Sequence, residues 1–234
     1  MNILITGVSR GLGRHIVKEL MQTSGHSVIG LSRDREALIG LRKEVSSRSG
    51  GSVFYGIQAD VSETGQIQRV REQMAELADS LDAMVNNAGV LVHKPFGMYT
   101  PDDFDKVFTT NLKAPFFLAQ EFLPLMKHGS HILNIGSMGG VQGSLKFPGL
   151  SLYSASKGAL SVWTESLAAE LSEKGIHVNC IAPGSIDTEM FAEAFPGAAA
   201  SFTASQAAAF ISFFITSGYR YFNGKILPLS VTTP

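Results

Sequence analysis

The chain begins with the apolar run Ile3–Ile5 and then reads Thr6-Gly7-Val8-Ser9-Arg10-Gly11-Leu12-Gly13 before an amphipathic stretch. Glycine suits a backbone that must turn tightly or approach a phosphate closely. The helix that follows would offer free N–H groups and the positive end of its dipole. The pattern is not a P-loop, because Arg14 rather than Gly-Lys-Ser/Thr continues it. A turn that uses glycine only for its conformation is the alternative, but the position after a first strand favours nucleotide binding.

Beyond this turn, short apolar runs alternate with longer amphipathic ones. Buried strands of a parallel sheet are typically apolar without alternation, and the matching runs are Ile3–Ile5, Val28–Leu31, Val53–Ile57, Ala83–Val85, His131–Ile135, His177–Ala182 and Lys225–Leu229. Helical stripes fall at Ile67, Val70, Met74 and Leu77, and at Leu160, Trp163, Leu167 and Leu171. The alternation predicts an α/β fold with a Rossmann-like, doubly wound parallel sheet, helices on both faces and right-handed crossovers.

Composition limits the domain count and the partners. With 234 residues and no repeat or break in composition, the chain is expected to form one domain over 1–234. A formal net charge of −1 gives no electrostatic footprint for nucleic acid, and no basic run or long apolar stretch indicates a membrane. Cys180 is the only cysteine, so an internal disulfide is impossible and a buried, inert thiol is expected. With no signal-peptide pattern after Met1, the expected location is cytoplasmic.

The end of the second predicted strand bears on the choice of cofactor. Folds that prefer NAD place a carboxylate here for the ribose 2′-hydroxyl, whereas an arginine accommodates a 2′-phosphate. Ser32 and Arg33 therefore favour NADP(H), and Arg10 would add a second positive charge. The alternative is that Arg33 is a solvated loop residue paired with Asp34, in which case NAD(H) remains open.

Tyr153 and Lys157 lie four residues apart, so they share one face of a helix. A neighbouring cation favours a phenolate, which makes such a pair suitable for acid–base chemistry. One such pair is weak evidence, because helices carry many of them as solvated faces.

Seven motifs, taken in order, resemble the short-chain dehydrogenase/reductase family over nearly the whole chain. The first is the glycine turn, whose spacing differs from the ordinary dinucleotide fingerprint. The others are Asp60-Val61, Asn86-Asn87-Ala88-Gly89, Asn111 in Thr110-Asn111-Leu112, Ser137 after Asn134-Ile135-Gly136, Tyr153 with Lys157, and Pro183-Gly184-Ser185-Ile186-Asp187-Thr188. Each motif alone could be a turn, a cap or a small residue at a strand end. Their joint occurrence favours the functional interpretation.

The resemblance implies hydride transfer between a nicotinamide cofactor and a carbonyl/alcohol pair. It implies that Tyr153 protonates the carbonyl oxygen while Ser137 hydrogen-bonds it, and that Lys157 binds the nicotinamide ribose and lowers the pKa of Tyr153. Asn111 would hold a water that resupplies the proton, completing the catalytic set Asn111, Ser137, Tyr153 and Lys157. The cofactor-binding residues implied are Gly7, Ser9, Arg10, Gly11, Leu12, Gly13, Ser32, Arg33, Asp60, Val61, Asn87, Ala88, Gly89, Tyr153, Lys157, Pro183, Gly184, Ile186 and Thr188.

Two segments depart from the family pattern. Ser137 and Tyr153 are 16 positions apart (153 − 137), so residues 143–150 are interpreted as a small insertion beside the substrate mouth. The cover that follows Thr188 is short, with a flap expected at about 189–204. Apolar residues in both segments, such as Phe147, Phe191 and Phe195, favour a hydrophobic or acyl-bearing carbonyl compound. Assembly as a homodimer or homotetramer is expected through the helices at 102–127 and 151–174.

The leading hypothesis is an NADPH-dependent reductase of a ketone, aldehyde or 3-oxoacyl compound. The rival enzyme is an NAD-dependent alcohol or hydroxysteroid-type dehydrogenase, and the rival outside enzymes is a catalytically silent NAD(P)-binding regulator. The regulator is disfavoured because the chain keeps both Tyr153 and Lys157. No metal is expected, since the six histidines show no ligand-like spacing.

Overall fold

The computed structural model describes residues 1–23, 25–46 and 50–231. Within them, seven parallel strands form one sheet in the order β3-β2-β1-β4-β5-β6-β9. The strands are β1 (Asn2–Thr6), β2 (Ser27–Ser32), β3 (Val53–Gln58), β4 (Leu81–Asn86), β5 (Met126–Ile135), β6 (His177–Pro183) and β9 (Ile226–Leu229). The strand order reverses between β1 and β4, as in a doubly wound nucleotide-binding fold. The predicted fold class is therefore confirmed.

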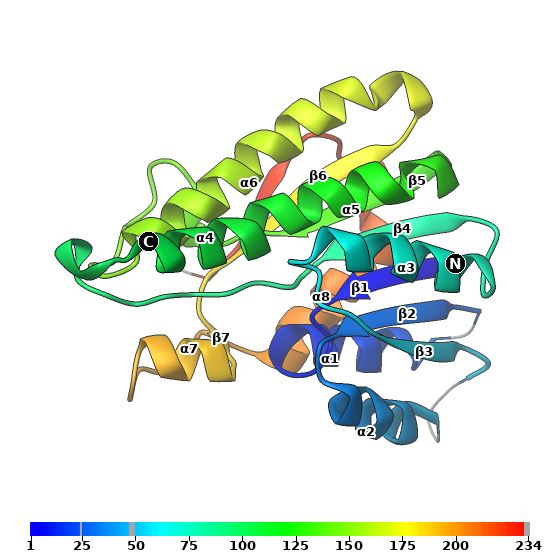
Figure 1. Cartoon of the computed structure of the whole chain (residues 1–234), viewed down its shortest axis with the longest axis horizontal. Coiled ribbons are helices and arrows are strands. Elements are labelled where there is room, and N and C mark those ends of the chain that lie inside the picture. Colours follow the sequence, from blue (N-terminus) through cyan, green and yellow to red (C-terminus); the bar gives the residue numbers. More distant parts are fainter. Residues whose placement is uncertain (24, 47–49, 232–234) are drawn as a thin grey trace.

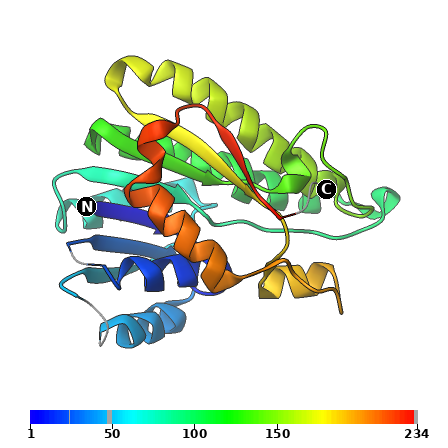
Figure 2. The ribbon, with the colours of Figure 1, turned by 180° about the vertical axis from the view of Figure 1, so that it is seen from behind.

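Helices cover both faces of this sheet (Figures 1 and 2). One face carries α1 (Gly11–Leu20), α2 (Arg35–Ser46) and α8 (Ala204–Thr216), and the other carries α3 (Thr64–Ala75), α5 (Ala114–Phe122) and α6 (Ser151–Glu170). The short helices are α4 (Pro101–Phe108) and α7 (Glu189–Ala194). Each face has its own apolar core because the strands are buried on both sides. Among the described residues, no helix combines the length and the apolar character of a membrane span.

The carboxyl ends of all seven strands meet at one edge of the sheet, because the strands are parallel. The segments that leave β1, β4, β5 and β6 gather at this edge, on the left in Figure 1. There, β7 (Ile186–Asp187) pairs with β8 (Phe202–Thr203) and closes the base of the segment that contains α7. Ligands of open α/β sheets bind outside the carboxyl ends of the strands, so this edge is where a site is expected.

Two elements differ from the expected boundaries. β5 begins at Met126 rather than His131, with a register shift that leaves Leu81 opposite Met126 and Ala83 opposite His131. Ser130 stabilises this irregular stretch, since its hydroxyl accepts from the Lys127 N–H and donates to the Leu81 carbonyl, both at 2.9 Å.

The single helix expected at 102–127 is interrupted. α4 ends at Phe108, a π-helical turn spans Thr109–Lys113, and α5 begins at Ala114. Pro115 has no N–H to donate to the preceding helical turn, and the π-helical turn lies directly before it. π-Helical turns inside helices often occur at functional sites, and this one contains Asn111.

Candidate active site

The N-terminus of α1 is suited to binding an anion. Arg10 occupies the cap position but its side chain makes no capping hydrogen bond, and the first turn contains no acidic residue. The first N–H groups of a helix have no partner within it, and with the dipole they favour a phosphate. Gly13 faces the Gly7 carbonyl and the Asn87 amide so closely that any Cβ would overlap both. The glycine turn therefore offers a bare backbone surface that suits a dinucleotide pyrophosphate.

Thr6 and Asn87 clasp this turn to the end of β4. The Thr6 hydroxyl accepts from the backbone N–H groups of Asn87 (3.0 Å) and Ala88 (2.9 Å). In return, the Asn87 amide donates to the carbonyls of Thr6 (2.9 Å) and Gly7 (3.0 Å). Asn87 thus fixes the shape of the turn, and the sequence did not single out Thr6 as its partner.

Ser32, Arg33 and Asp60 lie together at the ends of β2 and β3. Arg33 is exposed and pairs with Asp60 at 3.6 Å, not with Asp34 as the alternative interpretation held. Asp34 instead accepts from the Ala37 N–H at 2.9 Å near the start of α2. Burial raises the pKa of Asp60, but hydrogen bonds from Ser62 and the charge of Arg33 bring that pKa below its usual value. Asp60 is therefore ionised at neutral pH and holds Arg33 beside Ser32.

Tyr153 and Lys157, on α6, meet Ser137 at the end of β5. Burial raises the pKa of Tyr153 to about 12, and its hydrogen bond with Ser137 offsets this only in part. The expectation that Lys157 lowers this pKa is wrong for the structure as described. Lys157 Nζ donates to the Ile135 carbonyl at 2.7 Å and lies 5.9 Å from the Tyr153 ring centroid. Burial also lowers the pKa of Lys157 itself, to about 8.

Asn111 connects the segment after β4 to α6. Its side-chain oxygen accepts from the Val90 N–H at 2.8 Å, while its amide donates to the Val90 carbonyl at 2.9 Å and to the Ser156 hydroxyl at 3.0 Å. Ser156 in turn donates to the Tyr153 carbonyl at 2.7 Å. Asn111 lies in the π-helical turn and is fully buried. Ser156 was not predicted as a site residue, and only its place between Tyr153 and Lys157 could have indicated it.

The other residues implied in cofactor binding lie in the apolar core, beside Lys157, or at the end of β6. Leu12 and Ile186 pack in one apolar cluster with Ala204 and Ala207, so only their backbones are suited to a polar ligand. Gly89 faces Lys157 Nζ and the Asn111 side-chain oxygen, each 3.5 Å from where its Cβ would be. Val61 is half-buried against the core under α3. Pro183 and Gly184 end β6, where Gly184 N–H donates to the Leu229 carbonyl at 3.0 Å.

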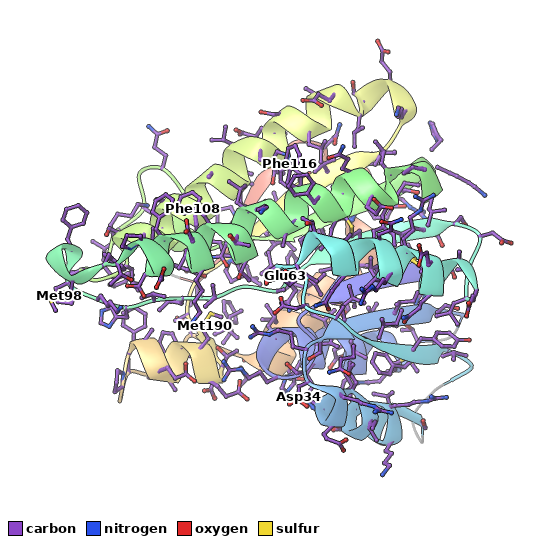
Figure 3. The ribbon with its side chains drawn as sticks, in the orientation of Figure 1. Asp34, Glu63, Met98, Phe108, Phe116 and Met190 are labelled. Atoms are coloured by element: carbon purple, nitrogen blue, oxygen red, sulfur yellow. The ribbon has the colours of Figure 1, made fainter. Side chains whose placement is uncertain are left out.

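The segment predicted as a flap, at about 189–204, follows Thr188 and contacts the glycine turn. The Thr188 hydroxyl accepts from the Phe191 N–H at 3.3 Å and so caps α7. Arg10 pairs with Glu193 of α7 at 3.3 Å, with both side chains exposed. In Figure 3, Met190 lies on the side of α7 that faces the segment after β4. The glycine turn and the flap are therefore neighbours, although 183 positions separate Arg10 from Glu193.

Residues 143–150 form a wall that is fixed at its base. Tyr99 Oη donates to the Gly149 carbonyl at 2.5 Å and lies 3.3 Å from the Val92 carbonyl. Lys94 N–H also donates to the Gly149 carbonyl, at 3.1 Å. Gly149 has a φ of +80° and packs so closely on His93 that a side chain would collide with the ring. Tyr99 was missed from the sequence, since nothing in its surroundings marked it as the anchor of an insertion 50 residues away.

The remaining reactive groups are inert or scattered. Burial raises the pKa of Cys180 to about 11, which keeps the thiol protonated. His131 is buried against the ring of Tyr219 with centroids 4.7 Å apart, and burial lowers its pKa to about 3. Within the described ranges, no group of three or more His, Cys, Asp or Glu residues could hold a metal ion.

Residues 1–199 match the family described as short chain dehydrogenase. The chain belongs to that family. Versicolorin reductase of Emericella nidulans is 35% identical to it over 80% of this chain and 70% of the relative. A short-chain dehydrogenase from Burkholderia cenocepacia solved in complex with NADP is 30% identical, with a TM-score of 0.87 and coverage of 97% of this chain and 95% of the other. A blue fluorescent protein from a metagenomic library, solved with NADPH, is also 30% identical. Its TM-score is 0.87, and the match covers 98% of this chain and 96% of the other. This short-chain dehydrogenase is thus an oxidoreductase by family.

Proposed function

We propose that this short-chain dehydrogenase is an NADPH-dependent carbonyl reductase with Tyr153 as its general acid. The observation that carries the proposal is the meeting of Tyr153, Ser137 and Lys157 at the same sheet edge as the bare glycine turn. Reduction places negative charge on the carbonyl oxygen, and a preorganised donor stabilises charge where it develops. When bound, the reduced nicotinamide supplies the hydride.

Tyr153 is suited to the reductive direction. A phenol whose pKa is about 12 keeps its proton throughout the neutral range. It can therefore give that proton to the carbonyl oxygen, while Ser137 donates a second hydrogen bond to the same atom. The presence of Tyr153, Ser137 and Lys157 at one place argues against a silent regulator.

Lys157 and Asn111 support the proton donor. Lys157 would hold the nicotinamide ribose through the ammonium group that it carries below about pH 8. The Asn111 side-chain oxygen accepts one hydrogen bond, from Val90, so it retains acceptor capacity for a water that resupplies the proton. Ile186 and Thr188 would orient the carboxamide of the cofactor.

The preference for NADPH rests on the end of β2. No carboxylate occupies the position of Ser32 or Arg33, and the Arg33 guanidinium pairs with Asp60 at 3.6 Å. An arginine at this place suits a 2′-phosphate. Two solved relatives carry NADP or NADPH, and the name of the curated relative, versicolorin reductase, supports the reductive direction.

The test measures oxidation of NADPH and of NADH at the absorbance of the reduced nicotinamide, with a panel of ketones, aldehydes and 3-oxoacyl thioesters. We expect turnover of at least one carbonyl class, with kcat/KM higher for NADPH than for NADH by tenfold or more. Equal use of both cofactors would contradict the role of Arg33, and the absence of any turnover would contradict the reductase.

Assembly through the predicted helices is also a proposal. The outer surfaces of α4, α5 and α6 expose Phe104, Phe116, Phe117 and Val162, and the Phe116 ring lies 5.8 Å from that of Trp163 on α6. Adjacent exposed apolar side chains favour burial against a second copy. Light scattering after size-exclusion chromatography should give a dimer or tetramer, and Phe116→Glu should shift it toward the monomer. The cytoplasmic location stays a prediction, which cell fractionation would test.

A further inference from the structure

Four rings from three separate segments meet at the substrate side of the sheet edge. Phe195 is their centre, with its centroid 5.4 Å from Phe147, 5.3 Å from Phe191 and 6.4 Å from His93. The Phe147 and Phe195 rings meet edge to face, at 71°. These distances lie within the range of attractive aromatic pairs. We call His93, Phe147, Phe191 and Phe195 the aromatic cluster.

The cluster lies at the same edge of the sheet as Ser137 and Tyr153 because of the chain topology. His93 follows β4, Phe147 lies between Ser137 and Tyr153 after β5, and the other two rings follow β6. The three segments therefore leave the same edge of the sheet, from the neighbouring strands β4, β5 and β6, and they contact one another through these rings. The rings remain half-buried or exposed, with Phe147 44% exposed, so their faces are open to a ligand.

The two sides of the cluster are held by different contacts. The segment that carries Phe147 is held by Tyr99, and His93 Nε2 lies 3.2 Å from the Pro148 carbonyl. Phe195 follows α7, which is linked to the glycine turn by the exposed Arg10–Glu193 pair. Exposed ion pairs contribute little to stability. The Phe147 side is therefore held by hydrogen bonds to the backbone, whereas the α7 side meets the glycine turn through a weak contact.

The cations beside the cluster are already engaged. Lys94, next to His93, pairs with Asp103 at 2.5 Å. Lys146, next to Phe147, donates to the Val141 carbonyl at 2.5 Å and to the Ser144 hydroxyl at 2.6 Å. A ligand that carries a phosphate or sits on an acidic protein would have to compete for them. The chemistry that the cluster offers is that of apolar aromatic faces.

We propose that the aromatic cluster makes this enzyme selective for flat, fused-ring aromatic ketones over saturated and linear acyl ones. This deepens the proposed reductase function and rests on it. An aromatic ring laid against Phe147 and Phe195 gains offset-stacked or edge-to-face contacts that an alkyl chain of equal area does not. Phe195 and Phe147 are specificity-determining residues, and they act on the position of the substrate rather than on the proton.

The experiment compares kcat/KM for 2-tetralone, 2-decalone and an acetoacetyl thioester, all with NADPH. The variants are Phe195→Leu and Phe147→Leu, which keep an apolar side chain but remove the ring. Phe195→Tyr restores a ring, and Phe213→Leu is the matched control, since Phe213 is 57% exposed on α8 on the other face of the sheet. Binding of 2-naphthol and of 2-decalol to the enzyme with NADP is measured in parallel by calorimetry.

The wild type should prefer 2-tetralone to 2-decalone by at least tenfold and bind 2-naphthol more tightly than 2-decalol. Each Phe→Leu change should lower kcat/KM for 2-tetralone by roughly two- to tenfold, the factor expected for one aromatic pair. Activity with 2-decalone and NADPH affinity should stay within about twofold. Phe195→Tyr and Phe213→Leu should behave like the wild type.

Two failures are distinguishable. The aromatic selectivity is overturned, while the reductase stands, if carbonyls are reduced but kcat/KM is the same for 2-tetralone and 2-decalone. It is also overturned if Phe195→Leu lowers kcat/KM for these two ketones equally. If no carbonyl is reduced, the proposed function fails. The comparison of 2-naphthol and 2-decalol binding then tests separately whether the aromatic cluster prefers aromatic ligands. Equal affinity for 2-naphthol and 2-decalol overturns the selectivity on its own.

Discussion

The nucleotide side and the substrate side of this site are held together by different means. On the nucleotide side, Thr6 and Asn87 exchange hydrogen bonds between the ends of two adjacent strands, β1 and β4. On the substrate side, Tyr99, Gly149 and the aromatic cluster join long segments to one another, away from the strands. The first arrangement depends on particular hydrogen-bonding atoms and on bare glycine backbone, whereas the second depends largely on ring contacts, whose loss leaves the backbone of the sheet unchanged. Binding of the cofactor should therefore tolerate mutation less than substrate choice does.

The largest effect should come from the residue at which the two sides meet. Tyr153→Phe removes the proton donor but keeps the ring in its buried place, so turnover should fall by about 10²–10⁴-fold, the usual range for general acid catalysis. NADPH affinity, measured by fluorescence of the reduced nicotinamide, should change less than threefold. A variant that keeps more than a tenth of wild-type turnover would show that another group supplies the proton.

The glycine turn offers the next strongest test, because it isolates the nucleotide side. In Gly13→Ala the new methyl group would collide with the Gly7 carbonyl and the Asn87 amide, so the turn must shift. We expect NADPH affinity to fall by more than about 100-fold and the protein to lose about 2–4 kcal/mol of unfolding free energy. Gly40→Ala is the control, since no atom lies within 4 Å of the position of its Cβ on α2 and alanine favours a helix by about 0.5–1 kcal/mol. If the control destabilises as much as Gly13→Ala, packing at the turn is not the cause.

Cofactor choice should respond to charge at the end of β2. Arg33→Asp removes the guanidinium beside Ser32 and places a carboxylate next to Asp60, so NADPH should bind about 10–100-fold more weakly while NADH is favoured. The ratio of kcat/KM for the two cofactors is the measurement. Arg35→Asp, at the first residue of α2, is the control for a general change of charge. An unchanged ratio in Arg33→Asp would refute contact with the 2′-phosphate.

The pH dependence of reduction should report Lys157 rather than Tyr153. Burial lowers the pKa of Lys157 to about 8, so its charge is present below this pH and is lost as pH rises through it. Tyr153, with a pKa of about 12, keeps its proton over the same range. We expect kcat/KM to be level below pH 8 and then to fall about tenfold per unit as the lysine deprotonates. A profile that stays level up to pH 10 would mean that the bound cofactor restores the lysine charge.

The two sides also differ in how far the sequence predicts them. The glycine turn, Asn87, Ser137 and Lys157 stand directly after strands or on one helix face, so local spacing is sufficient to bring them to one sheet edge. Tyr99 and Gly149 meet through a contact 50 positions apart, which no local pattern encodes. The same limit explains the missed start of β5, where the Ser130 hydroxyl fills a register shift against β4.

The spacing of residues in the sequence could not predict the pKa shifts of Tyr153 and Lys157 or the ion-pair partner of Arg33. An i, i+4 relation predicts that Tyr153 and Lys157 share a face, but the sign of the pKa shift depends on burial and on where the ammonium points. Lys157 donates to the Ile135 carbonyl, and desolvation then dominates both groups. Asp34 and Asp60 were both possible ion-pair partners of Arg33. Because β2 pairs with β3, Asp60 lies within reach of Arg33 and forms the ion pair.

The smallest expected effect isolates the substrate side. Tyr99→Phe keeps the ring and loses the hydrogen bond to the Gly149 carbonyl, which should cost about 1 kcal/mol of unfolding free energy. Because this bond anchors the segment that carries Phe147, KM for the carbonyl should rise about two- to fivefold while kcat and NADPH affinity stay near those of the wild type. Tyr221→Phe serves as the control, since Tyr221 is 83% exposed and lies far along the chain from this wall. A loss of NADPH affinity in Tyr99→Phe would show that the two sides are coupled through the segment after β4, and the contrast between them would then be wrong.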